Sequence, residues 1–227
     1  MSWSWVVVIL LALVVPLLAW RSASGIGEAG LRRGSLYVHA AVSLWVLGAL
    51  GYLGLKLDDG ALRDVGVFWS RGGWSFLAWT LGLTAGGLGL FAGSVALRRW
   101  GWLPMEGEAL RRLRPRGVGE GLLLALVLSP SAGLCEEFLY RGFMFRTIES
   151  PIGSAWAALV SSAAFGCAHA YQGWTGAVRA MAIGLILCAA PLMTGSIVPA
   201  MAAHALVDVV GVLLLWPWLE EMDPTAP

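Results

Sequence analysis

Three ionisable side chains, Glu136, Glu137 and Arg141, stand in the middle of an otherwise apolar stretch, residues 135–146. In a membrane helix an unpaired charge costs roughly 2.5 to 3.5 kcal/mol on insertion scales, so such charges are expected to be paired and used. Glu137 and Arg141 are four residues apart, which places them on one helical face and predicts an ion pair. Glu136 points about 100° away, towards another wall, and its carboxyl group is left for chemistry.

The composition indicates that this stretch lies in a membrane. Of the 227 residues 58% are hydrophobic and only 13% are charged, whereas soluble domains average about 25% charged. The mean hydropathy is +0.75, and the net charge of +1 gives no sign of a nucleic-acid partner. The three cysteines lie in separate segments without a CxxC pair, which argues against a disulfide framework or a thiolate zinc site.

Seven stretches are apolar enough to be spanning helices, each of which needs about 20 residues. They are residues 3–20, 36–55, 74–97, 120–148, 152–170, 177–193 and 196–218. Residues 3–20 lack a basic n-region and a small-residue cleavage site, so we expect a retained helix and not a signal peptide. We therefore predict an all-α, polytopic membrane protein with about seven transmembrane helices.

The arginines predict how the chain lies in the membrane. With seven spans, the loops 21–35 and 98–118 lie on the same side and carry nine arginines between them. The opposite loop, residues 56–73, carries three basic residues offset by three aspartates. The positive-inside rule therefore places the arginine-rich loops in the cytoplasm, the N-terminus outside and the C-terminus inside, and we expect a bacterial inner membrane.

Helix geometry decides which residues can meet Glu136. Residues 151–153 (Pro-Ile-Gly) are expected to form a turn, so the fourth and fifth spans run antiparallel and His169 comes within about two helical turns of Glu136 in height. His204 and Asp208 are four residues apart, hence on one face, and lie at a similar depth. We therefore expect these four side chains to converge from three helices.

A carboxylate, two imidazoles and a third polar group are the parts needed to activate a water molecule. Glu136 could act as the base on the water with help from a histidine, while a second histidine with Asp208 polarises a scissile carbonyl. These roles predict hydrolysis of an acyl bond, most simply a peptide bond. The same residue types also suit zinc, with Glu136, His169 and His204 as ligands and an open fourth position. The residues alone leave both versions open.

Three motifs in this order resemble those of the CPBP family, the CAAX protease and bacteriocin-processing (Abi) proteins. Residues 136–141 (EEFLYR) resemble the EExxxR motif, and residues 165–169 (FGCAH) resemble FxxxH. His204 and Asp208, preceded by a Thr-Gly turn, resemble the HxxxN/D helix. The resemblance covers about residues 118–215. It departs at Asp208, where the prenyl-protein branch has Asn, and at Tyr140, where Phe is common.

The resemblance implies an intramembrane endopeptidase with a CAAX-protease-like helical bundle. Residues 1–117 would form three N-terminal transmembrane helices and a basic cytoplasmic loop, residues 118–219 the catalytic core, and residues 220–227 a short tail. Glu136 would be the base on water, aided by His169, and His204 with Asp208 the oxyanion side. Since an ionised Asp208 would repel an oxyanion, we expect it to be protonated, paired with His204, or an orienting group.

The other motif residues are expected to support the site. Glu137 would pair with Arg141, and Phe165 would pack beneath the site without doing chemistry. We prefer a glutamate-type mechanism that requires no cofactor, with zinc held by Glu136, His169 and His204 as the alternative.

The expected partner is a membrane-anchored or membrane-proximal protein or peptide in the bilayer, such as a bacteriocin or signalling-peptide precursor. Prenylated substrates are less expected in a bacterium. Two other functional classes use the same features. One is a non-catalytic membrane protein of the same fold, such as a bacteriocin immunity factor or scaffold, and the other is a transporter or proton relay.

Overall fold

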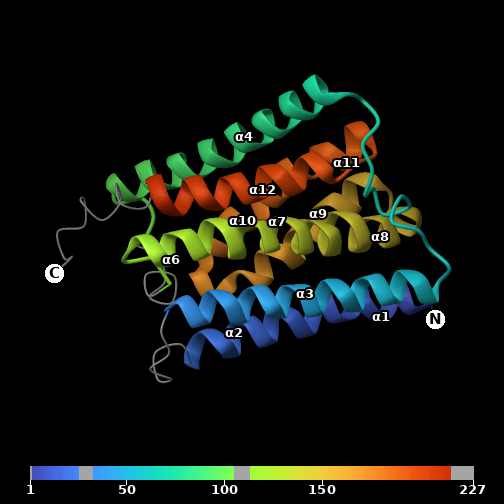
Figure 1. Cartoon of the computed structure of the whole chain (residues 1–227), viewed down its shortest axis with the longest axis horizontal. Helices are drawn as coiled ribbons and strands as arrows, with labels where there is room; N and C mark the ends of the chain where they lie inside the picture. Colours follow the sequence, from blue (N-terminus) through green and yellow to red (C-terminus); the bar gives the residue numbers. More distant parts are fainter. Residues whose placement is uncertain (1, 26–32, 105–112, 216–227) are drawn as a thin grey trace.

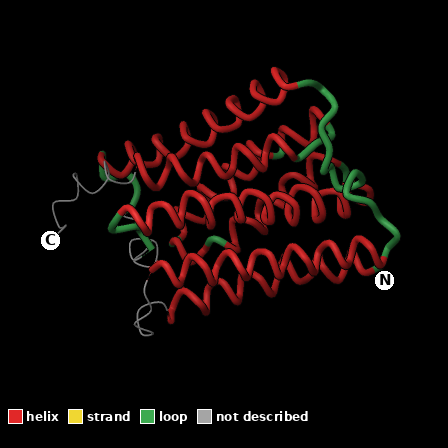
Figure 2. Tube along the Cα trace, in the orientation of Figure 1, coloured by secondary structure: helices red, strands yellow, loops and turns green. Residues whose placement is uncertain are grey.

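The computed structural model describes residues 2–25, 33–104 and 113–215 (Figure 1). Within these ranges every regular element is a helix, as Figure 2 shows, which confirms the predicted all-α class. Five helices have the length and apolar composition to cross a membrane. Two shorter apolar helices, Ser154–Ala168 and Val198–Leu213, bring the described segments to the predicted seven. The predicted tail, residues 220–227, lies outside the described residues.

The N-terminal part of the chain forms one layer of the bundle. The first span runs without a break through α1 (Trp3–Ile9), the π-helical segment η1 (Leu10–Val14) and α2 (Val15–Gly25). It packs along α3 (Arg33–Leu57), beside it in Figure 1. This layer covers one side of the central helix with apolar side chains.

The motif with both glutamates lies on one long helix in the centre of the bundle (Figure 1). It is built from five consecutive pieces: α6 (Val118–Leu123), η2 (Leu124–Leu128), α7 (Ser129–Glu137), η3 (Phe138–Met144) and α8 (Phe145–Ile152). The pieces η2 and η3 are π-helical, a winding that often accompanies functional sites. On the far side of this helix from α3 lie α4 (Gly73–Arg99) and α12 (Val198–Val210), and α12 continues as η5 (Gly211–Leu215).

The remaining helices carry the second motif. They are α9 (Ser154–Ala168), the short 3₁₀ turn η4 (Ala170–Gln172), α10 (Trp174–Leu187) and α11 (Ala189–Thr194). The turn predicted at residues 151–153 contains fewer residues than expected. The helix α8 continues through Pro151 to Ile152, and the chain reverses at Gly153. Proline keeps a helical φ and loses only one hydrogen bond near a helix end, whereas the φ of +81° at residue 153 favours glycine.

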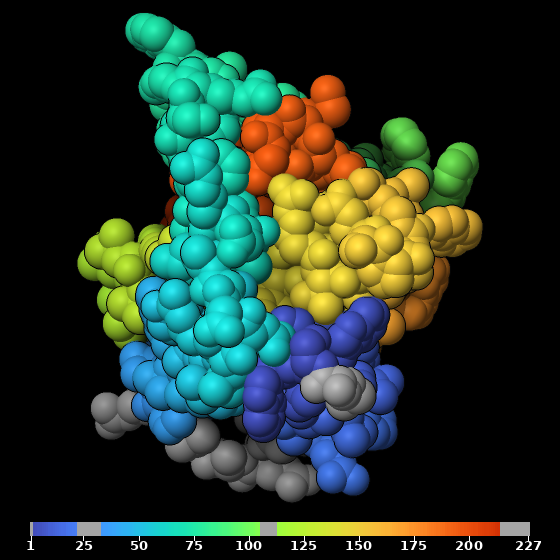
Figure 3. All heavy atoms as spheres, turned by 90° about the vertical axis from the view of Figure 1, so that its right-hand side faces the viewer, coloured from blue at the N-terminus to red at the C-terminus, as the bar shows by residue number. Residues whose placement is uncertain are grey.

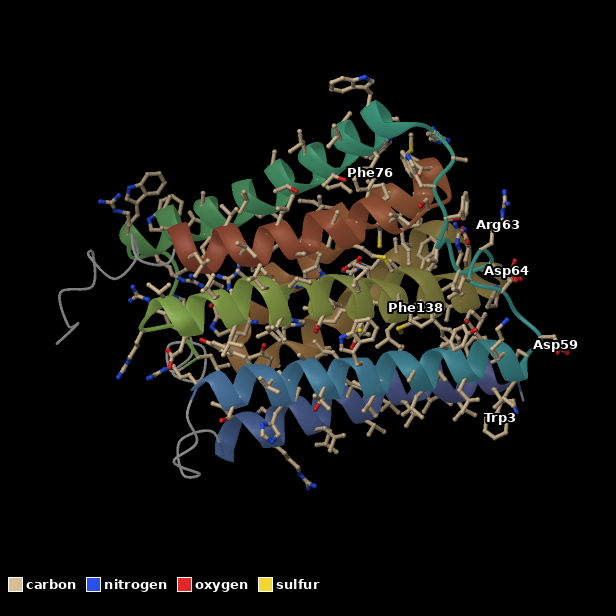
Figure 4. All side chains as sticks on the ribbon, viewed as in Figure 1. Trp3, Asp59, Arg63, Asp64, Phe76 and Phe138 are labelled. Carbon is tan, nitrogen blue, oxygen red and sulfur yellow. The ribbon has the colours of Figure 1, made fainter. Side chains whose placement is uncertain are left out.

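Glycines at two contacts bring the motif-bearing helices α7 and α9 close to their neighbours α12 and α10. A Cβ atom on Gly133 of α7 would lie 2.5 Å from the carbonyl oxygen of Met201 in α12. A Cβ atom on Gly166 of α9 would lie 2.7 Å from that of Ala177 in α10. Small residues of this kind allow helix backbones to approach in a membrane. On the other side, Phe138 lies between the central helix and α3 (Figure 4), where Gly51 leaves room for its ring.

The two ends of the bundle differ in character. The end of α2, the start of α3, the end of α4 and the start of α6, which flank the arginine-rich loops, lie at the same end of the bundle, as predicted (Figure 1). Arg32, Arg111 and Arg112 of these loops lie outside the described residues. At the opposite end, the loop of residues 58–72 crosses the surface beside α8 (Figure 3) and carries Asp59, Arg63 and Asp64 (Figure 4).

The loop of residues 58–72 is fixed to the turn before α12. The backbone N–H of Ile197 donates to the carbonyl oxygen of Gly66 at 3.0 Å, and the Ser196 hydroxyl donates to that of Phe68. Gly142, the residue after Arg141, faces this loop, and a Cβ atom there would lie 2.8 Å from the carbonyl oxygen of Val65. The loop thus covers the end of the bundle next to η3.

Candidate active site

The structure brings Glu136, His169 and His204 together from three helices. Glu136 lies in α7, His169 caps the end of α9, and His204 lies in the middle of α12. Oε2 of Glu136 is 3.6 Å from Nε2 of His204 and 4.0 Å from Nε2 of His169. The predicted depths account for this meeting, because α9 stops in the interior of the bundle at the level of Glu136.

Glu137 has two partners, and only one of them was predicted. Its Oε1 atom is 2.9 Å from Nη1 of Arg141, the ion pair expected from their spacing, and both side chains are fully buried. The same oxygen is 2.7 Å from Nδ1 of His204. Nothing in the sequence signals this second contact, since it depends on the rotation of α12 against α7.

Asp208 stands further from His204 than we predicted for a pair. Its Oδ2 atom is 3.8 Å from Nε2 of His204, too far for a hydrogen bond, and 36% of its side chain is exposed. One helical turn separates the two residues, so their shared face is as expected. The structure therefore presents Asp208 as a neighbouring charge on the cavity side of His204.

Hydrogen bonds fix how the two imidazole rings face Glu136. Nδ1 of His169 is 2.8 Å from the carbonyl oxygen of Phe165, and because a carbonyl only accepts, Nδ1 must donate. The Nε2 atom of neutral His169 then carries a lone pair. Nδ1 of His204 likewise donates to the Glu137 carboxylate, so both Nε2 atoms point to Glu136. Oε2 of Glu136 is buried and has no hydrogen-bond partner among the described residues.

Phe165 packs at the centre of the site, as predicted for the first residue of its motif. Its ring centroid lies 4.3 Å from that of His169 and 5.8 Å from that of His204. The guanidinium carbon of Arg141 lies 4.3 Å from the same centroid, a cation–π contact that stabilises the buried charge. On its other side the ring meets Tyr140 edge-on at 5.2 Å. Sequence reasoning treated Tyr140 only as a conservative departure from the motif.

Two cavities border the site. A cavity of about 90 Å³ lies against His169, His204 and Asp208. A larger one of about 430 Å³ lies between α4 and α10, where the glycines of α4 leave open space. Arg179 of α10 lines both cavities. His169, His204 and Asp208 therefore face a hollow that adjoins an apolar groove at Arg179.

Glu136, His169 and His204 are also candidate zinc ligands. Zinc takes carboxylate oxygen and imidazole nitrogen at about 2.0 to 2.2 Å, so neighbouring ligand atoms in a tetrahedral site are about 3.3 to 3.5 Å apart. Here the separations from Oε2 of Glu136 are 3.6 and 4.0 Å, and no group of three or more His, Cys, Asp or Glu among the described residues is arranged to hold a metal ion. The donor types suit zinc, but their spacing in this structure is wider than a zinc site requires.

The comparison with protein-family models points to the same segment of the chain as the site geometry. Residues 118–210 match the family model described as type II CAAX prenyl endopeptidase Rce1-like. No curated protein and no solved structure matches the chain. The matched segment contains every residue of the three motifs and both helix contacts made by glycine. Over residues 118–210 the chain is therefore similar to the Rce1-like type II CAAX prenyl endopeptidases, in agreement with the resemblance to the CPBP proteins seen in its motifs.

Proposed function

We propose that the protein is an intramembrane endopeptidase that hydrolyses a peptide bond of a membrane-anchored or membrane-proximal protein or peptide. The observation that carries this proposal is the buried Oε2 atom of Glu136, which has no hydrogen-bond partner in the described parts of the chain and is faced by two imidazole Nε2 atoms. A water molecule in this position would donate one hydrogen bond to Glu136 and one to Nε2 of His169. Both acceptors are aligned before the substrate arrives.

The reaction then needs only groups on this chain. Glu136 takes a proton from the water as its oxygen forms a bond to the scissile carbonyl carbon. In its imidazolium form His204 donates from Nδ1 to Glu137 and from Nε2 to the oxyanion, so Glu137 fixes the donor in place. The proton on Glu136 passes to the leaving nitrogen, and the C–N bond breaks. Asp208, on the cavity side, orients His204 as the oxyanion forms.

Substitution of Glu136 tests the proposal directly. The wild-type protein and Glu136→Gln are purified, reconstituted into liposomes and incubated with a library of membrane peptides. We expect cleavage by the wild type and a loss of about 10²- to 10⁴-fold in the variant, the usual contribution of a general base. Glu120→Gln, in the first turn of α6, is the matched control and should retain full activity. Equal cleavage by Glu136→Gln would refute the assignment.

The zinc version makes a different prediction in the same preparation. If zinc held by Glu136, His169 and His204 supplied the Lewis acid, purified protein would contain stoichiometric zinc and a chelator would abolish cleavage. The glutamate-type reaction is expected to survive chelation. If no peptide is cleaved and a protective effect against a peptide toxin survives Glu136→Gln, the protein is an immunity factor or scaffold of the same fold.

The placement of the chain in the membrane is part of the proposal. We infer an inner-membrane protein of a bacterium whose arginine-rich end faces the cytoplasm, which puts the loop of residues 58–72 outside. The shared end of the two arginine-rich loops supports this orientation. Single cysteines placed at Asp59 and Arg99 in a cysteine-free chain test it, since an impermeant thiol reagent added to whole cells should label only the first. Labelling of the second alone would reverse the orientation.

A further inference from the structure

The side chain of Tyr140 has a buried hydroxyl group that takes no part in the reaction described above. Only 3% of the residue is exposed, and its hydroxyl has no hydrogen-bond partner among the described residues. A buried hydroxyl without a partner costs about 1 to 3 kcal/mol, so the few such groups in a native fold call for an explanation. A partner that arrives with the reaction, such as water or substrate, would remove this cost.

The surroundings of Tyr140 belong to the active site. Its ring packs edge-on against Phe165 at 5.2 Å, and the same phenylalanine contacts the rings of His169 and His204. Tyr140 also follows Glu136 by four residues on the central helix, which puts both side chains on nearly the same face.

Two complementary atoms are therefore left without partners on one face of one helix. Oε2 of Glu136 is a pure acceptor when ionised, and the Tyr140 hydroxyl is a donor. No hydrogen bond joins these two atoms to each other. A single water molecule between them would donate to Glu136 and accept from Tyr140, which satisfies both buried atoms.

We propose that Tyr140 is a further catalytic residue, whose hydroxyl donates a hydrogen bond to the water that Glu136 activates. This role rests on the proposed hydrolytic function. The water donates its two hydrogens to Glu136 and His169, accepts one from Tyr140, and keeps one lone pair to attack the carbonyl carbon. As the water loses its proton to Glu136, the Tyr140 donor stabilises the negative charge that develops on the attacking oxygen. The tyrosine keeps its own proton throughout.

Tyr140→Phe is the test, because it removes the hydroxyl and keeps the ring that packs on Phe165. We expect kcat to fall by about 10- to 100-fold, which corresponds to the loss of one buried hydrogen bond to a developing charge, with KM changed less than about twofold. The midpoint of thermal unfolding should stay the same or rise, since a buried group without a partner has been removed. Tyr52→Phe on the exposed face of α3 is the control and should have no effect.

A double substitution separates a shared water from a structural effect. If Tyr140 and Glu136 act on the same water, Tyr140→Phe should lower the residual activity of Glu136→Gln by less than about twofold. A wild-type kcat in Tyr140→Phe, a fall in unfolding midpoint that parallels the fall in kcat, or a full additional loss in the double variant would each overturn the proposal. If the wild type cleaves nothing, the hydrolytic function itself fails. If it cleaves and only Glu136→Gln is inactive, the role of Tyr140 alone is wrong.

Discussion

Nδ1 of His204 lies 2.7 Å from Oε1 of Glu137, while Nε2 of the same ring lies 3.6 Å from Oε2 of Glu136. The two adjacent glutamates therefore approach one imidazole from its two nitrogens. Glu137 is fully buried, bonded and paired with Arg141, whereas Oε2 of Glu136 has no bonded partner among the described residues. The Glu137 carboxylate therefore holds Arg141 and His204 in place, and the Glu136 carboxylate is left for the reaction.

Neutralising Glu136 and neutralising Glu137 should both abolish activity but should differ in their effect on stability. Glu137→Gln leaves the Arg141 charge buried without its counterion and weakens the bond to His204, so we expect a loss of about 3 to 5 kcal/mol in stability together with a loss of activity. Glu136→Gln removes a charge whose Oε2 atom has no hydrogen-bond partner among the described residues, and should keep the wild-type unfolding midpoint while losing activity. Thermal unfolding in detergent measures both. Equal destabilisation by the two substitutions would contradict this division of roles.

Gly133 sets the distance between α7 and α12. A Cβ atom there would lie 2.5 Å from the carbonyl oxygen of Met201, so Gly133→Ala must push the two helices apart. We expect a loss of about 1 to 3 kcal/mol in stability and a lower kcat, because His204 moves away from Glu137. Gly82→Ala on α4 is the matched control, since a Cβ atom at that position meets nothing within 4 Å. Its stability should be unchanged or higher.

The ring of Phe165 contacts three functional groups of the site. Phe165→Leu keeps an apolar side chain but removes the aromatic contacts to His169, His204 and Arg141, and should cost about 1 to 2 kcal/mol in stability. We also expect kcat to fall more than KM rises, because the histidines lose their support. Phe76→Leu, at an aromatic contact with Trp69 far from the site, serves as control in both measurements.

Asp58 attaches the start of α1 to the end of α3 and makes this contact pH-dependent. Its carboxylate accepts from the Ser4 hydroxyl at 2.6 Å and from the backbone N–H groups of Ser4 and Trp3 at 2.7 and 3.1 Å. The bond from the Ser4 hydroxyl, followed by those from the backbone, lowers the pKa of Asp58 below its ordinary value. A lowered pKa stabilises the folded contact above the unfolded pKa of about 3.9 and loses this contribution as pH falls through the folded value.

The attachment should therefore be intact at neutral pH and weaken only below about pH 4. The chemical shift of the Ser4 amide, followed by NMR through an acid titration, reports the contact directly. Asp58→Asn keeps an acceptor oxygen but cannot titrate, so its amide shift should stay constant over the same range. A transition in Asp58→Asn that matches the wild type would assign the titration to another group.

Residues close together in the sequence were predicted well. The seven helical segments follow from runs of apolar residues, and the Glu137–Arg141 pair follows from their spacing, because the helix repeat fixes which neighbours share a face. The order of the three motifs also predicted the family model that residues 118–210 match. The roles proposed for Glu136, His169, His204 and Asp208 stay predictions until the variants are measured.

The sequence by itself determined which helices form, which faces carry charge and which residues reach a common depth. Only the tertiary structure decided that Glu137 bonds His204, that Asp208 stands 3.8 Å from the same ring, and that no described residue bonds the buried Tyr140 hydroxyl. The physical reason is that contacts within a helix follow from its fixed repeat. Contacts between helices depend on their rotation and approach, which are set here by packing at small residues such as Gly133 and Gly166.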